Sequence, residues 1–224
     1  MIGVIVPAHN EEAVIGRCID ALIRAGTHPD LGGEDVHIVV VMDTCADDTA
    51  KVVSRYDVQG VLGHYANVGK ARAAGAEHLL SQGARWLAFT DADSLVPHDW
   101  LVEQLRCGTD VVCGTVTVED WSLRADEVRT RYDALYRPIE GHRHIHGANL
   151  GVSAAAYCSV GGFKPLAAHE DVKLVSDLTA TGATITWTAR NSVTTSARLD
   201  CRCREGFADY LRSLMTTASV ESRP

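Results

Sequence analysis

The first half of the chain alternates short apolar runs with segments whose apolar residues recur every three or four positions. The apolar runs contain many β-branched residues, which is typical of strands buried on both faces of a sheet. They predict strands at Ile2–Val6, Val36–Met42, Gln59–Leu62, Arg85–Phe89 and Asp110–Val118. The periodic segments predict helices at Glu11–Ala25, Asp47–Tyr56, Asn67–Ser81 and Pro97–Leu105. This alternation favours an α/β fold with a parallel, helix-covered sheet and right-handed crossovers.

The second half of the chain is less regular. It predicts helices at Ser122–Tyr136, Ser153–Ser159, Glu170–Thr181 and Gly206–Ala218. Two short strands are predicted at Thr184–Trp187 and Ser192–Thr195, and the His- and Gly-rich segment Gly141–Gly151 is predicted to be a loop or an edge strand. The sequence contains no internal repeat, low-complexity tract or linker. We therefore expect one domain over residues 1–224, in which a nucleotide-binding half (1–118) is followed by a half (119–224) that completes a pocket.

The composition is that of an ordinary soluble globular protein, with 46% hydrophobic and 22% charged residues among 224. A formal net charge of −8 argues against binding to nucleic acid or to an anionic membrane, because both need a basic patch. No apolar run approaches the roughly 20 residues that a membrane-spanning helix needs. We therefore expect no transmembrane segment, while a peripheral contact with the inner face of a membrane stays open.

The seven cysteines are odd in number and scattered along the chain. The chain starts Met1-Ile-Gly-Val without a basic stretch, so we expect no secretory signal and a reduced, cytoplasmic setting. Cys201 and Cys203 form the only close pair, and no second Cys or His pair accompanies them, which argues against a zinc site.

Two carboxylates, Asp91 and Asp93, directly follow the apolar run Trp86–Phe89. In an open parallel sheet, ligands bind beyond the carboxyl ends of the strands. Two neighbouring hard oxygen ligands suit Mg²⁺ or Mn²⁺ carrying a diphosphate. A D-x-D pair also arises by chance in turns, so its interpretation depends on the residues around it.

Three further segments carry polar residues to the same edge of the predicted sheet. The first is Val4–Glu12, in which a polar cluster follows the first strand, and the second is Val41–Thr49, in which Asp43 ends the second strand. The third, Asn67–Gly75, opens a helix with Gly, Lys and Arg residues. A helix N-terminus with cationic side chains is suited to binding an anion.

Together these motifs resemble those of family 2 glycosyltransferases with the GT-A fold, in the order in which that family carries them. The matching segments are Pro7 to Glu11, Asp43 to Thr49, Asn67 to Gly75, Asp91 to Asp93, Gly147 to Asn149, Gly161 to Phe163, and Glu170-Asp171. The resemblance implies a mainly parallel central sheet flanked by helices, with a smaller antiparallel, acceptor-side part in the C-terminal half.

The resemblance also assigns donor-side roles to individual residues. It implies that four residues line the nucleoside pocket: Pro7, Ala8, Asn10 and Glu11. It implies further that Asp43 contacts the base, that Lys70 lies near the nucleotide, and that Asp91 approaches the ribose or donor sugar. Asp93 is expected to bind the metal ion, Mn²⁺ or Mg²⁺, on the diphosphate.

On the acceptor side, the resemblance implies that Asp171 is the general base and that Asn149 and Glu170 help to shape the acceptor or donor-sugar pocket. The reaction would be an inverting transfer to a hydroxyl group. UDP-sugar is the default donor and GDP-sugar the alternative. The acceptor, whether saccharide, small molecule or lipid-linked, is left open, as is a homodimer or lipid contact through Gly206–Ala218.

The chain departs from the family pattern at two positions. Met42 replaces the first of two tandem acids, which leaves the predicted base contact to Asp43 alone. The stretch Val193–Arg198 lacks a His that several relatives use as a metal ligand, and Arg198 is a candidate to face the diphosphate instead. The long C-terminal region of membrane-bound relatives is also missing from this sequence.

Alternative functions remain at this point. A sugar-1-phosphate nucleotidyltransferase usually has a Gly-rich basic loop after the first strand, whereas this chain has the acidic loop Pro7–Glu12. A dinucleotide-binding dehydrogenase would need G-x-G-x-x-G there, which is absent. A noncatalytic nucleotide-sugar-binding protein is disfavoured by the retained acids.

Several residues also have purely structural explanations. Glu11 and Glu12 could complement the dipole of the first helix, and Asp47 and Asp48 could cap the second. Lys70 and Arg72 could be solvated helix residues, and Glu170-Asp171 could cap the following helix. Three histidines resemble a metal-binding tract: His142, His144 and His146. Because no partnering Cys or spaced His pair accompanies them, they could instead line a loop or the acceptor pocket.

Overall fold

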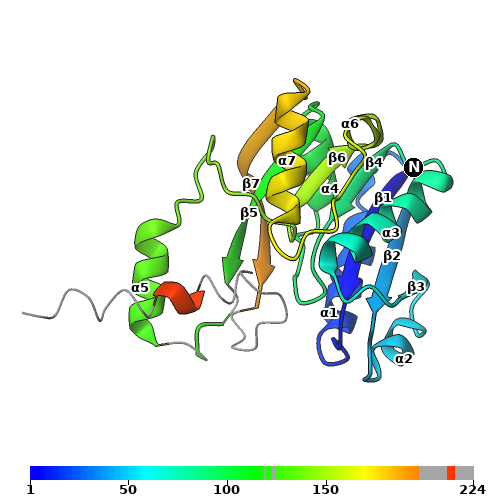
Figure 1. The fold of residues 1–224 in the computed structure, drawn as a ribbon, viewed down its shortest axis with the longest axis horizontal. Helices are drawn as coiled ribbons and strands as arrows, with labels where there is room; N and C mark the ends of the chain where they lie inside the picture. Colours follow the sequence, from blue (N-terminus) through cyan, green and yellow to red (C-terminus); the bar gives the residue numbers. More distant parts are fainter. Residues whose placement is uncertain (119, 123–124, 197–210, 215–224) are drawn as a thin grey trace, which may run out of the picture.

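A seven-stranded sheet with the order β3-β2-β1-β4-β6-β5-β7 forms the centre of the protein in the computed structural model (Figure 1). The structure describes residues 1–118, 120–122, 125–196 and 211–214. The strands are β1 (Ile2–Ala8), β2 (Val36–Asp43), β3 (Gln59–Gly63), β4 (Trp86–Phe89), β5 (Val111–Val118), β6 (Leu150–Ser153) and β7 (Ile185–Thr195). β6 is antiparallel to both of its neighbours, and the other pairs are parallel. This arrangement confirms the predicted α/β fold.

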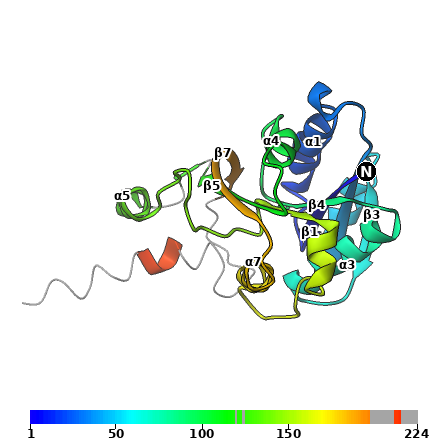
Figure 2. The ribbon, with the colours of Figure 1, turned by 90° about the horizontal axis from the view of Figure 1, so that it is seen from above.

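Helices cover both faces of the sheet, as Figure 2 shows, with α1 and α4 on one face and α3 and α7 on the other. The helices are α1 (Ile15–Gly26), α2 (Thr49–Val53), α3 (Val68–Ser81), α4 (Trp100–Arg106), α5 (Asp126–Leu135), α6 (Ala154–Ser159) and α7 (Glu170–Ala180), with a 3-10 turn at Pro29–Leu31. Alternate residues of a strand point to opposite faces, so β1 contributes to both cores. Val4 and Val6 belong to the core under α1, and Ile5 to the core under α3.

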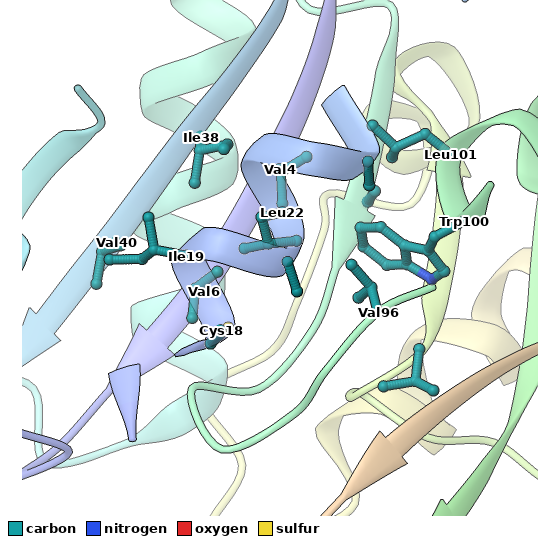
Figure 3. Close-up of a cluster of buried hydrophobic side chains, with 14 of the residues drawn as sticks. Val4, Val6, Cys18, Ile19, Leu22, Ile38, Val40, Val96, Trp100 and Leu101 are labelled. Carbon is teal, nitrogen blue, oxygen red and sulfur yellow. The ribbon is translucent and has the colours of Figure 1, made fainter. Parts of the chain in front are cut away.

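The core under α1 is built from apolar side chains that its sequence spacing predicts. In Figure 3, Ile19 and Leu22 of α1 lie over Val4 and Val6 of β1, and Trp100 of α4 closes one side. These side chains are 0–1% exposed. Burying each such aliphatic side chain contributes about 1.5–3 kcal/mol, so this core anchors β1 and β4, whose ends carry the candidate site.

The first helix begins at Ile15 rather than at Glu11. Asn10 has a positive φ of 53°, and the backbone N–H groups of the next two residues are already used. Glu11 N–H donates to Thr49 Oγ1 (2.8 Å), and Glu12 N–H donates to Asp47 Oδ2 (3.0 Å). The segment after β1 is therefore tied to the loop after β2, and a turn in which Ile15 N–H donates to Glu11 O (2.9 Å) leads from it into α1.

Two elements of the second half differ from the prediction. The segment Gly141–Gly151, predicted as a loop or an edge strand, runs into β6, which lies in the interior of the sheet between β4 and β5. The two predicted strands Thr184–Trp187 and Ser192–Thr195 form the single strand β7. Its register against β5 shifts between Gly114 and Thr115, so the polar residues between the two predicted strands form an irregularity within β7.

The helix α5 starts later than the predicted Ser122–Tyr136 and lies to one side of the main sheet (Figure 1). It packs Val128 and Tyr132 against Val116 of β5 in a separate small core. Arg198, Cys201, Cys203 and most of the predicted helix Gly206–Ala218 lie outside the described residues, although 211–214 are helical. Across the described parts of the chain, no helix is long and apolar enough to cross a membrane.

Candidate functional site

The carboxyl ends of β1, β2 and β4 surround a pocket of about 570 Å³. This volume lies within the range of small-molecule sites in proteins. Three of the predicted site residues, Asn10, Glu11 and Asp93, line it together. The remaining lining residues are Glu12, Ala13, Val14, Ala46, Asp47 and Ser196. Because the charged side chains among them are all carboxylates, an anionic ligand would need a cation to accompany it there.

The loop after β1 is held in shape by the loop after β2. Asn10 Oδ1 accepts a hydrogen bond from Ala46 N–H (2.7 Å), and Glu12 Oε2 accepts one from Asp48 N–H (2.7 Å). Asp47 Oδ2 accepts in return from Glu12 N–H. Glu12 and Asp47 therefore fix loop geometry, in line with structural roles for both. Pro7 and Ala8 end β1 just before this loop, and Ala8 is buried.

Asp43 organises the segment that leads from β3 into α3. Its Oδ1 accepts from the N–H groups of Tyr65 (2.6 Å) and Ala66 (3.0 Å), and its Oδ2 accepts from Asn67 N–H (2.9 Å). Burial by itself would raise the pKa of Asp43, but these hydrogen bonds outweigh burial and lower the pKa. The carboxylate is therefore a structural anchor, and a contact with a nucleotide base stays a prediction.

The first turn of α3 lies next to the segment that precedes α7. Asn67 caps the helix by accepting from Lys70 N–H (2.8 Å), and its Nδ2 donates to Leu166 O (2.7 Å). A Cβ on Gly69 would lie 2.8 Å from Lys164 O, so only glycine allows this approach. Lys70 is exposed on the first turn, where a cationic side chain is open to solvent and to ligands.

Arg72 connects the D-x-D segment to α7. This side chain of α3 is 5% exposed, and its two terminal nitrogens donate to different carboxylates: Nη2 to Asp91 Oδ1 (2.5 Å) and Nη1 to Glu170 Oε1. Burial opposes the charge, but the carboxylates of Asp91, Glu170 and Asp171 outweigh it and raise the pKa of Arg72. The interpretation of Arg72 as a solvated helix residue is therefore wrong.

Glu170 and Asp171 begin α7, directly after His169, which has a positive φ of 59°. Asp171 Oδ2 accepts from Gly147 N–H (2.7 Å), and Oδ1 accepts from Val172 N–H (2.8 Å). Glu170 is buried, and burial raises its pKa while the Arg72 guanidinium counters that effect. Arg72 thus bridges Glu170, the first acid of the pair, and Asp91, although these residues are far apart in sequence.

Asn149 lies in the core rather than on the pocket wall. Its Oδ1 accepts from Trp100 Nε1 (2.9 Å), and its Nδ2 donates to the carbonyl oxygens of Thr115 (2.8 Å) and Asn191 (2.7 Å). The side chain is fully buried and links α4, β5 and β7. It can shape a sugar pocket by holding these backbones, and that role stays a prediction.

The three histidines before β6 form a stack with Tyr136. The Tyr136 and His144 rings lie 4.3 Å apart, and His142 lies 5.4 Å from His144. Burial, together with the neighbouring histidines, lowers the pKa of His146 to about 3, so this ring is neutral at physiological pH. Within the described residues, no group of three or more His, Cys, Asp or Glu side chains could hold a metal ion.

The surroundings of Cys18 indicate concentrated negative charge at the pocket. Cys18 Sγ donates to Asp91 O (3.4 Å), and burial raises the pKa of this thiol, with Asp93, Asp91 and Glu11 adding to the effect. Mg²⁺ and Mn²⁺ are often held by one or two carboxylates together with substrate phosphates, without a complete set of protein ligands. Asp93, on a pocket wall that also carries Glu11, Glu12 and Asp47, fits such an ion as a single carboxylate ligand.

Comparison with protein families gives a direct match. The sequence profile described as glycosyl transferase family 2 matches residues 3–166, which is more than half of the chain. The matched range includes the loops after β1, β2 and β4 and the start of α3. No curated protein sequence matches the chain.

Solved structures share the fold along most of the chain. TarS 1–349 of S. aureus in complex with UDP-GlcNAc has a TM-score of 0.69 and 15% identity, covering 98% of this chain and 66% of that one. Mannosyltransferase PcManGT of Pyrobaculum calidifontis in complex with GDP-Man and Mn²⁺ has a TM-score of 0.66 and 18% identity, covering 99% and 65%. GalNAc-T7 with UDP, GalNAc and Mn²⁺ has a TM-score of 0.69 and 15% identity, covering 89% and 44%. The chain spans less than two thirds of the length of these proteins, and identities this low support a shared fold alone.

Proposed function

The chain belongs to glycosyl transferase family 2, and on that premise we propose that it transfers a sugar from a nucleotide diphosphate-sugar to a hydroxyl group of an acceptor. The observation that carries the proposal is the meeting of two acidic segments at one edge of the sheet. Arg72 hydrogen-bonds both Asp91, beside Asp93, and Glu170, beside Asp171. A group-transfer reaction between two substrates needs such separate acidic groups, one for the leaving group and one for the attacking group.

In this proposal the donor occupies the pocket at the ends of β1, β2 and β4. Pro7, Ala8, Asn10 and Glu11 line the nucleoside side, Asp43 lies at the base, and Lys70 lies near the nucleotide. Asp91 approaches the ribose or the donor sugar. The nucleotide is UDP or GDP: TarS was solved with UDP-GlcNAc and PcManGT with GDP-Man, so the neighbours include both.

We assign Asp93 as the protein ligand of a divalent cation, Mn²⁺ or Mg²⁺. The ion would neutralise the negative charge that develops on the departing diphosphate. The fit of a carboxylate-rich pocket supports this assignment, as does the Mn²⁺ in the PcManGT and GalNAc-T7 structures.

Asp171 is the base in this proposal. Its carboxylate takes the proton of the acceptor hydroxyl while the acceptor oxygen bonds to the anomeric carbon and the bond from that carbon to the diphosphate breaks. Two backbone N–H groups hold the carboxylate, which retains lone pairs to receive the proton. Attack opposite the leaving group inverts the configuration of the sugar. Asn149 and Glu170 support the acceptor side from the core.

A panel of UDP- and GDP-sugars, screened by thermal shift with and without Mn²⁺, tests this function. We expect a metal-dependent rise in Tm with one nucleotide class, lost in Asp93→Ala and kept in Asp57→Ala, an exposed residue before β3, away from the pocket. Asp171→Asn should keep donor binding and lose transfer of the sugar. If no nucleotide sugar shifts Tm under any metal condition, the proposed function is wrong.

A further inference from the structure

The proposed chemistry leaves one buried charge without a role. Arg72 is the charged side chain that contacts both acidic segments of the site, yet the proposed mechanism assigns it no contact with donor, metal or acceptor. Arg72 belongs to the first half of α3 (Val68–Ser81), a helix that lies on the same face of the sheet as α7 (Figure 2).

The guanidinium group is enclosed on several sides. A Cβ on Gly147 would lie 2.5 Å from Arg72 Cζ, so the backbone of this residue packs directly on the guanidinium. The Phe163 ring lies 5.8 Å from Cζ. Gly147 is also the residue whose N–H donates to Asp171. Arg72 therefore contacts the segments of Asp91, Gly147 and Glu170, and each of these three carries or holds a proposed site residue.

We propose that Arg72 is a positioning residue that couples the donor side of the site to its acceptor side. One terminal nitrogen orients Asp91, and the other fixes Glu170, so that the first turn of α7 presents Asp171 toward the donor sugar. This inference rests on the proposed function, because it assigns Asp91 to the donor and Asp171 to the acceptor.

The chemistry of the side chain explains why an arginine stands here. A guanidinium is planar and offers five N–H donors in a fixed fork, so it can hold two carboxylates at a set angle. A lysine ammonium is a point charge on a flexible stem and cannot impose that geometry. Positioning matters because a displacement of about 1 Å at reacting groups can lower a rate by about 100-fold.

A purely structural ion pair would produce the same contacts, so the test must separate the two roles. Arg72→Met leaves Glu170 buried without its partner, and removing one member of a buried ion pair is strongly destabilising. Replacing both members, in the double variant Arg72→Met with Glu170→Gln, removes the buried charge and should recover most of the lost Tm. The recovery of Tm is therefore the structural readout, and kcat for sugar transfer is the positioning readout.

We expect the double variant to regain Tm but to keep a kcat about 100-fold below that of the wild type. The nucleotide that binds the wild type, UDP or GDP, should still raise its Tm, because Asn10 and Glu11 are untouched. Arg72→Lys should also have a kcat well below that of the wild type. If Arg72→Met fails to fold, Arg72→Lys allows the same comparison of Tm with kcat.

The pair Arg85 and Glu34 supplies the matched control. Arg85 donates two hydrogen bonds to Glu34 (2.7 and 2.5 Å), and it directly precedes β4, at the end of the strand opposite to the site. Arg85→Met with Glu34→Gln should leave kcat unchanged. A double variant at 72 and 170 that regains both Tm and wild-type kcat would show that the ion pair is only structural. A wild-type chain that transfers no sugar would overturn the proposed function, and the coupling with it.

Discussion

At the scale of single residues, neighbouring carboxylates have different surroundings. Asp91 has a side chain 37% exposed and bonds Arg72, whereas Asp93, two residues on, lines the pocket with Asn10 and Glu11. The turn between them, in which Ser94 N–H donates to Asp91 O (3.1 Å), directs the two side chains to different partners. One short motif can therefore serve both a protein ion pair and a ligand.

Asp43→Asn should destabilise the protein. The change replaces an acceptor oxygen with an NH₂ donor facing backbone N–H groups of residues 65–67. Leaving such groups without an acceptor costs about 1–3 kcal/mol in the free energy of unfolding. Urea unfolding at pH 7 measures the difference, and a variant as stable as the wild type would refute the anchoring role.

The same variant should show a pH dependence. Because the folded-state pKa of Asp43 is lowered, its contribution is fully present above the unfolded-state pKa of about 3.9. The contribution is lost as pH falls from there through the folded-state value, because over that range the unfolded chain binds a proton that the folded chain does not. The gap in unfolding free energy between wild type and Asp43→Asn should therefore narrow below about pH 4. A gap that widens on acidification would contradict the lowered pKa.

At the scale of elements, close packing of α3 on the sheet sets the geometry of the site. Gly75 faces β1 and β2, where an added Cβ would lie 2.7 Å from Ile5 Cγ2 and 3.0 Å from Val41 Cγ2. The helix can therefore approach the strands more closely than any side chain would allow. Because Arg72 lies one turn earlier on the same helix, this approach also determines how far Arg72 reaches toward Asp91.

Gly75→Ala should lower both stability and transfer. Helix propensity alone would favour alanine by about 1 kcal/mol, but overpacking a core costs about 1–3 kcal/mol and moves the helix outward. The half-exposed neighbour Ala74 is the control: Ala74→Gly should cost about 1 kcal/mol through propensity and leave transfer largely intact. Chemical unfolding and transfer assays measure both variants. A Gly75→Ala variant more stable than the wild type would show that the space between α3 and the sheet accommodates a methyl group.

At the scale of the whole molecule, the sheet interleaves the two halves of the chain. β6, from the second half, lies between β4 and β5 of the first, and β7 pairs with β5. Removing the second half would leave β4 and β5 without their shared neighbour and expose Phe89 and Leu87, which are fully buried. We therefore expect the two halves to fold as one cooperative unit rather than as two separable domains.

The full chain should accordingly unfold in one calorimetric transition, with equal calorimetric and van't Hoff enthalpies. A fragment of residues 1–118 should lack a cooperative transition and aggregate through its exposed strands. Two resolved transitions, or a fragment that melts cooperatively, would contradict the single unit.

Much of the fold could be predicted because local patterns encode it. Runs of β-branched residues predict strands that are buried on both faces. Asn67 ahead of an Ala-rich segment predicts the start of α3, because a helix and its cap depend on residues only a few positions apart. The ordered motifs resemble those of family 2 glycosyltransferases, and the profile match over residues 3–166 confirms that membership.

Only the tertiary structure decided which of these residues contact one another. The interior place of β6, the continuous β7, the burial of Asn149 and the bridge from Arg72 to Asp91 and Glu170 all depend on contacts between distant segments. The sequence alone leaves open that an arginine in the Ala-rich helix α3 is solvated, until its neighbours are known. The physical reason is that local periodicity specifies which face of an element is apolar, whereas the partner of a polar side chain is set by how the elements pack.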